Sequence, residues 1–125
     1  MIAGIGIDIV EIGKMRAAVR RRDERFLRKL FTQQEIEYCH RCRDPAPRLA
    51  AKFAAKEAVL KAFKVGWTHG VKWTEVEVFV DEDGSPRVAL QGILKHIAEE
   101  RKVHNILLSL THSGSYAIAY ATLLI

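Results

Sequence analysis

A carboxylate and two ammonium groups recur at helical spacing near the centre of the chain. The Ala-rich segment Phe53–Ala62 predicts a helix on which Glu57, Lys61 and, just beyond, Lys64 share a narrow arc of one face. A carboxylate among cations can hold a divalent metal while its neighbours contact phosphate oxygens, so the pattern fits phosphoryl chemistry. The alternative is a solvent-exposed ion pair, because Glu followed four residues later by Lys is a favourable surface pairing.

A second carboxylate, Asp8, lies in an apolar N-terminal segment, 4–12. The segment alternates with period two, so its odd-numbered isoleucines point to one face and its two glycines and Asp8 point to the other. Glycine in a strand often marks the close approach of a ligand or of another backbone. Burying an aspartate is costly unless it is paired, hydrogen-bonded or bound to a metal. The alternative is that Asp8 ends the strand and caps the next helix.

Three motifs occur in order: Gly-Ile-Asp-Ile-Val-Glu-Ile at the N-terminus, Phe-Ala-Ala-Lys-Glu-Ala-x-x-Lys-Ala in the centre, and Ser-Leu-Thr-His-Ser at 109–113. Together they resemble the holo-[acyl-carrier-protein] synthases, the small 4'-phosphopantetheinyl transferases of fatty acid biosynthesis, over essentially the whole chain. The resemblance implies transfer of 4'-phosphopantetheine from coenzyme A to a serine of apo-acyl carrier protein, with release of adenosine 3',5'-bisphosphate. It also implies the 4'-phosphopantetheinyl transferase fold and a homotrimer with active sites between neighbouring subunits.

The matched motifs imply the catalytic roles. Asp8 and Glu57 are expected to hold Mg²⁺, which prefers a few carboxylates together with substrate oxygens and water. Lys61 is expected to contact phosphate and to stabilise the leaving group. The general base stays open between Glu57 and a metal-bound water that Glu57 polarises.

The resemblance also implies contacts to coenzyme A. Thr111 and His112 are expected to contact its phosphates, and Pro86, which ends a Gly-Ser-Pro turn, is expected to contact the nucleotide. Lys52 stands where the family commonly has Arg, so it keeps the charge and loses bidentate phosphate recognition. After the central motif the family usually has Gly-x-Gly, whereas this chain has Lys-Val-Gly. Lys64 is therefore expected to supply a side-chain contact in its place.

Eight of the twenty Lys and Arg residues lie between residues 14 and 29. Apolar residues at helical spacing fill the other side, so the segment predicts an amphipathic helix with a cationic exterior. The resemblance makes this helix the docking site of the acidic carrier protein, with Lys14, Arg22 and Arg25 as the best candidates. The plainer alternative is a solvated basic face with no partner. A nucleic-acid partner is not expected, because the segment lacks the interleaved aromatic residues of a single-strand binder.

Length and composition predict one α+β domain over residues 1–125, mainly an antiparallel sheet packed against helices. The formal charge of +5 favours an anionic partner. No apolar run reaches 18 residues, so a membrane partner is not expected, and two cysteines without a second ligand pair fit a cytoplasmic protein better than a zinc site. The rival functions are a basic nucleic-acid-binding module and a metal-dependent phosphohydrolase.

Cap and turn residues set the expected elements. We expect strands at about 2–9, 75–80, 87–90, 106–111 and 116–125. We expect helices over the basic segment and at about 32–42, 47–64 and 92–101, with a loop at 66–70. The last strand is apolar on both faces for most of its length, so a helix or another subunit must cover it.

Overall fold

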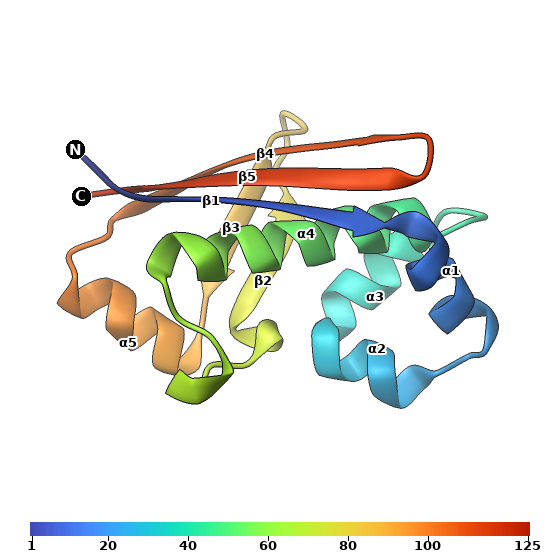
Figure 1. The fold of residues 1–125 in the computed structure, drawn as a ribbon. Coiled ribbons are helices and arrows are strands. Elements are labelled where there is room, and N and C mark those ends of the chain that lie inside the picture. The colour runs from blue at the N-terminus through green and yellow to red at the C-terminus, as the bar shows by residue number, and fades with distance from the viewer.

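The computed structural model describes residues 1–125, apart from the side chain of Trp67. A three-stranded antiparallel sheet with the order β1-β5-β4 lies along the long central helix α4, and a two-stranded antiparallel sheet, β2-β3, packs beside that helix (Figure 1). The elements in chain order are β1 (Ile2–Glu11), α1 (Ile12–Arg20), α2 (Glu24–Leu30), α3 (Gln33–Cys39), α4 (Ala46–Phe63), η1 (Trp67–His69), η2 (Trp73–Glu75), β2 (Val76–Val80), β3 (Pro86–Leu90), α5 (Gly92–Glu100), β4 (Asn105–Ser113) and β5 (Tyr116–Leu124). The expected α+β domain with antiparallel sheets packed on helices is confirmed.

Helix α4 is the centre of the molecule. Thirteen of its eighteen residues are buried, which explains why it is Ala-rich on every side and carries no clear apolar stripe. Its N-terminal half packs with α1, α2 and α3, and its C-terminal half packs with both sheets and α5. No helix in the part of the chain that the structure describes has the length and apolar character needed to cross a membrane.

The glycines of β1 allow this strand to lie directly on α4. A Cβ at Gly6 would lie 1.9 Å from the carbonyl oxygen of Ala58, and a Cβ at Gly4 would lie 2.2 Å from that of Ala62. Both distances are far below van der Waals contact, so only glycine permits this approach. The two alternatives for a Gly-rich strand are thereby resolved: the close neighbour is another backbone, and it belongs to α4.

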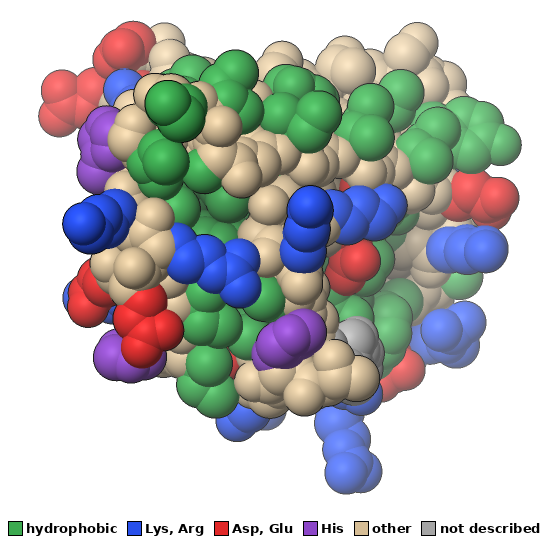
Figure 2. Space-filling model, turned by 60° about the vertical axis from the view of Figure 1, so that its left-hand side comes forward, with side chains coloured by type: hydrophobic (Ala, Val, Ile, Leu, Met, Phe, Trp, Pro, Cys, Tyr) green, Lys and Arg blue, Asp and Glu red, His purple; other side chains and the backbone are tan. Residues whose placement is uncertain are grey.

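The expected cover of β5 is present on one face. Its inward-facing Ala117, Ala119 and Ala121 are fully buried against α4. On the opposite face, the side chains of Tyr116, Ile118 and Tyr120 remain 37–46% exposed. The isoleucines of the neighbouring β1 are 58–60% exposed at positions 5, 7 and 9. A row of hydrophobic side chains therefore runs along the sheet side of the molecule (Figure 2).

The basic segment is not the continuous helix that its periodicity predicts. It forms two helices, α1 and α2, which are separated at residues 21–23. Arg22 has a left-handed φ of 52°, and the Asp23 side chain accepts a hydrogen bond from the backbone N–H of Phe26, so it caps α2. The break turns α2 to pack on η2 and leaves the basic side chains on the outside.

Several element ends also differ from expectation. Helix α3 ends at Cys39, so Cys42 lies beyond it, and residues 66–70 contain the short helix η1. Helix α4 ends at Phe63, because Lys64 adopts a left-handed C-cap conformation with φ 58°. The expectation that Lys64 shares a helical face with Glu57 and Lys61 is therefore wrong.

A buried ion pair joins α3, α4 and β2. The Lys56 ammonium lies 2.6 Å from Glu35, and both side chains are at most 1% exposed. Lys56 also donates to the carbonyl oxygen of Val76, while Glu35 accepts from the backbone N–H of Val78 and caps α3 together with Thr32. Burial lowers the pKa of Lys56, and the Glu35 carboxylate opposes that shift. With every donor and acceptor satisfied, this network fixes β2 on the central helix.

Candidate active site

Asp8 and Lys61 meet where β1 crosses α4. The Lys61 ammonium donates to Asp8 Oδ1 at 2.8 Å and to the carbonyl oxygen of Ile7 at 3.1 Å. The Asp8 side chain is 16% exposed and that of Lys61 is 54% exposed, so the pair lies at the edge of the buried interior. Asp8 does not cap the following helix, because no side chain caps the N-terminus of α1. The structure thus brings together two of the expected catalytic residues.

Glu57 lies one helical turn before Lys61 and has a different partner. Its Oε1 accepts a hydrogen bond from the indole N–H of Trp73, in η2. The surface ion pair between Glu57 and Lys61 is absent from the described residues, because Lys61 binds Asp8 instead. That alternative interpretation of the central motif is therefore wrong. The second carboxylate oxygen, Oε2, makes no hydrogen bond or ion pair with a described residue.

The chemistry of this donor set fits Mg²⁺. Among the described residues, no three His, Cys, Asp or Glu side chains cluster as a complete protein-built metal site. Mg²⁺ does not need such a cluster, because it commonly takes one or two carboxylates and fills its other positions with substrate phosphate and water. Asp8 Oδ2 and Glu57 Oε2 are hard oxygens that make no hydrogen bond or ion pair with a described residue.

A separate pocket of about 300 Å³ gathers most of the residues expected to contact coenzyme A. Its lining comes from α3, α4, β2, the β2-β3 turn, β3 and β4, and it includes Lys52, Pro86, Thr111 and His112. These four residues are up to sixty positions apart in the chain. The structure therefore brings this part of the predicted site together, although Asp8, Glu57 and Lys61 do not line the pocket.

Lys52 lines this pocket as a buried, hydrogen-bonded cation, not as an exposed one. It is 5% exposed, and its ammonium donates to the carbonyl oxygen of Val78 at 2.6 Å. The Tyr38 ring lies 4.9 Å from that ammonium, and burial lowers the pKa of Lys52. The exposed cation in the lining is Arg48, one turn earlier on α4. Arg48 was not a candidate from the sequence, although its i,i+4 spacing to Lys52 is visible there.

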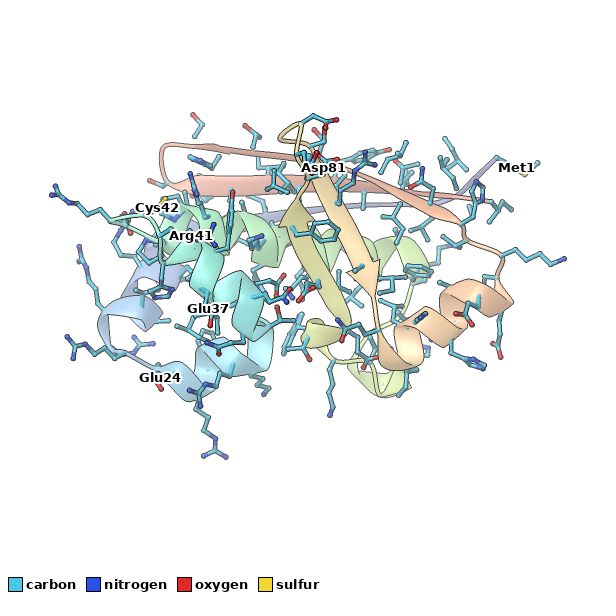
Figure 3. The ribbon with its side chains drawn as sticks, turned by 180° about the vertical axis from the view of Figure 1, so that it is seen from behind. Met1, Glu24, Glu37, Arg41, Cys42 and Asp81 are labelled. Atoms are coloured by element: carbon cyan, nitrogen blue, oxygen red, sulfur yellow. The ribbon has the colours of Figure 1, made fainter. Side chains whose placement is uncertain are left out.

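Lys64 and the basic segment lie outside this pocket. The left-handed C-cap places Lys64 at the end of α4, where Arg101 also donates to the carbonyl oxygen of Phe63. Lys14, Arg22 and Arg25 are exposed on α1, on the α1-α2 turn and on α2. A groove of about 270 Å³ lies beside Arg22, and its lining combines the apolar Val19, Leu27 and Ile36 with Arg22, Glu24, Arg28, Gln33 and His40. Seen from behind, the labelled Glu24 and Glu37 lie on α2 and α3 at this side of the molecule (Figure 3).

The chain matches known proteins over its whole length. Residues 4–121 match the model of the 4'-phosphopantetheinyl transferase superfamily. A holo-[acyl-carrier-protein] synthase of Solibacter usitatus is 38% identical over 98% of both chains. The crystal structure of the Helicobacter pylori holo-[acyl-carrier-protein] synthase in complex with coenzyme A has a TM-score of 0.83 and 28% identity, covering 96% of this chain and 99% of that one. The Neisseria meningitidis enzyme has a TM-score of 0.89 and 26% identity over the full length of both chains.

Proposed function

Because this chain belongs to the 4'-phosphopantetheinyl transferase superfamily, we propose that it is a holo-[acyl-carrier-protein] synthase that uses Mg²⁺. It transfers 4'-phosphopantetheine from coenzyme A to a serine of apo-acyl carrier protein and thereby serves fatty acid biosynthesis. The observation that carries the proposal is the Asp8–Lys61 pair beside Glu57, on β1 and α4, which hold the first two of the three matched motifs.

The reaction is a displacement at phosphorus. The serine oxygen forms a bond to the phosphorus that carries the pantetheine, the pyrophosphate bond breaks, and adenosine 3',5'-bisphosphate leaves with the electron pair. Asp8 and Glu57 would hold Mg²⁺, which supplies charge neutralisation for the pyrophosphate when it is bound. Lys61, with more than half of its side chain exposed, can exchange Asp8 for a phosphate oxygen of the substrate.

Glu57 is our candidate for the group that takes the serine proton. The serine proton goes either to Glu57 itself or, where Oε2 is taken by the cation, to a water that Glu57 polarises. The hydroxyl of a serine is a weak nucleophile until its proton has an acceptor, so orientation of this carboxylate matters for the rate.

The pocket between α4, β3 and β4 is our candidate for the nucleotide end of coenzyme A. Its apolar lining suits a nucleotide base, and Arg48, Thr111 and His112 can offer hydrogen bonds to phosphate. Lys52 lies in the wall of this pocket, where it also holds β2 in place. Lys64, at the exposed end of α4, is proposed to contact the substrate from outside the pocket.

The exposed basic face of α1 and α2 is our candidate for the carrier-protein surface. Lys14, Arg22 and Arg25 are exposed cations, and the groove beside Arg22 includes the apolar Val19, Leu27 and Ile36. Opposite charges raise the rate of encounter, and an apolar groove can take an anchoring side chain.

We also propose a homotrimer. The exposed hydrophobic row on β1 and β5 is the surface that a second copy would cover. The separation of the coenzyme A pocket from Asp8 and Glu57 within one chain supports an active site that two subunits complete. The two free cysteines are consistent with the cytoplasmic location that we propose.

Mass spectrometry tests this function directly. An apo-carrier protein incubated with coenzyme A, Mg²⁺ and this protein should gain the mass of one phosphopantetheine. Asp8→Asn and Glu57→Gln should each remove turnover without changing the fold, because each removes a negative oxygen from the metal site. Absence of the added mass with every carrier tested would refute the proposal. Substantial turnover by either variant at saturating Mg²⁺ would remove that residue from the metal site.

A further inference from the structure

The environment of Glu57 contains a residue that the motifs did not identify. The indole N–H of Trp73 donates to Glu57 Oε1, across sixteen positions of sequence. A glutamate side chain has several rotatable bonds, and an unrestrained carboxylate samples many positions. A hydrogen bond from a rigid ring to one oxygen restricts that freedom and leaves the other oxygen accessible.

Trp73 is itself held by the helix that carries Glu57. The Phe53 ring, four residues before Glu57, lies 5.9 Å from the Trp73 ring at an interplanar angle of 51°. Lys56, the residue immediately before Glu57, donates to the backbone carbonyl oxygen of Trp73 at 3.1 Å. Phe53, Lys56 and Glu57 thus contact the ring, the backbone and the indole N–H of one residue. The position of the indole is therefore defined relative to the Glu57 backbone.

The Lys56 contact rests on the buried ion pair described above. Lys56 is held at 2.6 Å by Glu35 and at 2.6 Å by the carbonyl oxygen of Val76, and it is fully buried. The carbonyl oxygen of Trp73 therefore accepts a hydrogen bond from an ammonium group whose position is already fixed by Glu35 and Val76. A solvent-exposed lysine would not provide such an anchor.

From this geometry we propose that Trp73 is a positioning residue for Glu57, holding Oε1 so that Oε2 is presented to the divalent cation. The effect of Trp73 on the transfer reaction rests on the proposed function, because that function requires an oriented Glu57 carboxylate at the metal site. Groups that orient metal ligands from behind change metal affinity or activity by about 10–100-fold when they are removed. Trp73 does not line the coenzyme A pocket, and the Lys29 ammonium of the basic face lies 6.0 Å from the centre of its ring. Because Trp73→Phe retains an aromatic ring beside Lys29, the effect of losing the indole N–H should fall on the metal.

The test is cation binding by the protein alone. We expect Trp73→Phe, which keeps an aromatic ring and removes the N–H, to bind Mn²⁺ about 10-fold more weakly in electron paramagnetic resonance titrations. The Mg²⁺ concentration that gives half-maximal transfer should rise by a similar factor, while the KM for coenzyme A stays unchanged. In a Glu57→Gln background, Trp73→Phe should cause no further loss of Mn²⁺ affinity.

The matched control is Phe53→Leu. It removes the ring contact with Trp73, but Lys56 still holds the Trp73 backbone and the indole N–H still reaches Glu57, so Mn²⁺ affinity should stay within about twofold of the wild type. If Trp73→Phe does not fold, site-specific replacement of Trp73 by 3-(3-benzothienyl)alanine retains the bicyclic shape and removes only the N–H.

The outcomes separate this proposal from the proposed function. A folded Trp73 variant with wild-type Mn²⁺ affinity overturns the positioning role, and so does a wild-type chain that binds no Mn²⁺. A wild-type chain that binds Mn²⁺ and transfers no phosphopantetheine refutes the function while the effect of Trp73 on Mn²⁺ still stands. A fall in the affinity of Phe53→Leu equal to that of Trp73→Phe also overturns the proposal, because ring packing alone would then explain both.

Discussion

Replacing Gly6 by alanine tests how the contact between β1 and α4 positions Asp8. The new Cβ would lie 1.9 Å from the carbonyl oxygen of Ala58, whereas ordinary contact begins at 3.4 Å. The contact is therefore short by about 1.5 Å, and the neighbouring atoms are helix backbone that cannot rotate away. Overpacking by a methyl group typically costs 1–3 kcal/mol, and with no flexible neighbour we expect about 3 kcal/mol or more.

The same displacement should affect the site. Asp8 is two residues from Gly6 on the same face of β1, and its carboxylate is 2.8 Å from Lys61 on the helix that would be pushed away. A misplacement of about 1 Å at a reacting centre can reduce the rate on the order of 100-fold. We therefore expect Gly6→Ala to lower kcat strongly even at a temperature where the variant is fully folded.

Thermal unfolding followed by circular dichroism and the carrier-protein transfer assay measure the two effects. For a chain of this size, about 3 kcal/mol corresponds to a fall in Tm on the order of 10 °C. The control is Gly13→Ala in α1, where a Cβ would meet no atom within 4 Å. Because alanine favours helix, Gly13→Ala should be neutral or should stabilise by about 0.5–1 kcal/mol. A Gly6→Ala protein with wild-type Tm refutes the close packing, and one with a low Tm but wild-type kcat refutes its link to Asp8.

Two further predictions concern charged residues. Lys61→Ala should lower kcat on the order of 100-fold, because it removes the cation that faces the phosphate, whereas Lys64→Ala should mainly raise the KM for coenzyme A. Equal, mild effects in steady-state kinetics would argue against both roles. Reversing Arg22 and Arg25 to Glu should raise the KM for the carrier protein and flatten its dependence on salt, with the KM for coenzyme A unchanged. If both substrates weaken together the surface belongs to the nucleotide site, and if neither weakens it is solvated surface only.

The sequence was most informative where a local rule was sufficient. The capping box of Thr32 and Glu35 predicted the start of α3, and the structure contains both of its hydrogen bonds. The alternation of β1 placed Gly6 and Asp8 on one face, which is the face that meets α4. These features depend on residues within a few positions of each other, so no tertiary information was needed.

The break in the basic segment shows where such rules were insufficient. A left-handed residue is usually glycine or asparagine, and here it is Arg22, so the sequence offered no glycine to mark the turn. The cap on α2 was visible in principle, because Asp23 is a favourable residue at the start of a helix. The apolar periodicity of the segment continues through the turn and obscured that cap.

The partner of Glu57 could not have been identified from spacing alone. Within the central motif, the nearest cation to Glu57 is Lys61, and the i,i+4 rule favours that pair. Lys61 instead reaches Asp8 and the carbonyl oxygen of Ile7, and Glu57 accepts from Trp73. Which pairing forms depends on where β1 and η2 lie against α4, and that is fixed by distant residues such as Gly6 and Lys56.

The exposed isoleucines of β1 connect assembly to the site through the pleat of one strand. Ile7 and Ile9 flank Asp8 and point to the opposite face, where they are 60% and 58% exposed. A neighbour that covered them would be separated from the Asp8 side chain by a single layer of backbone. The Ile7 carbonyl oxygen also accepts from Lys61, so the strand that would carry the subunit contact also holds the lysine that we propose contacts phosphate. Burying the apolar face would therefore restrict the motion of the β1 backbone, which positions both Asp8 and Lys61. The proposed assembly would in this way affect the geometry of the proposed active site.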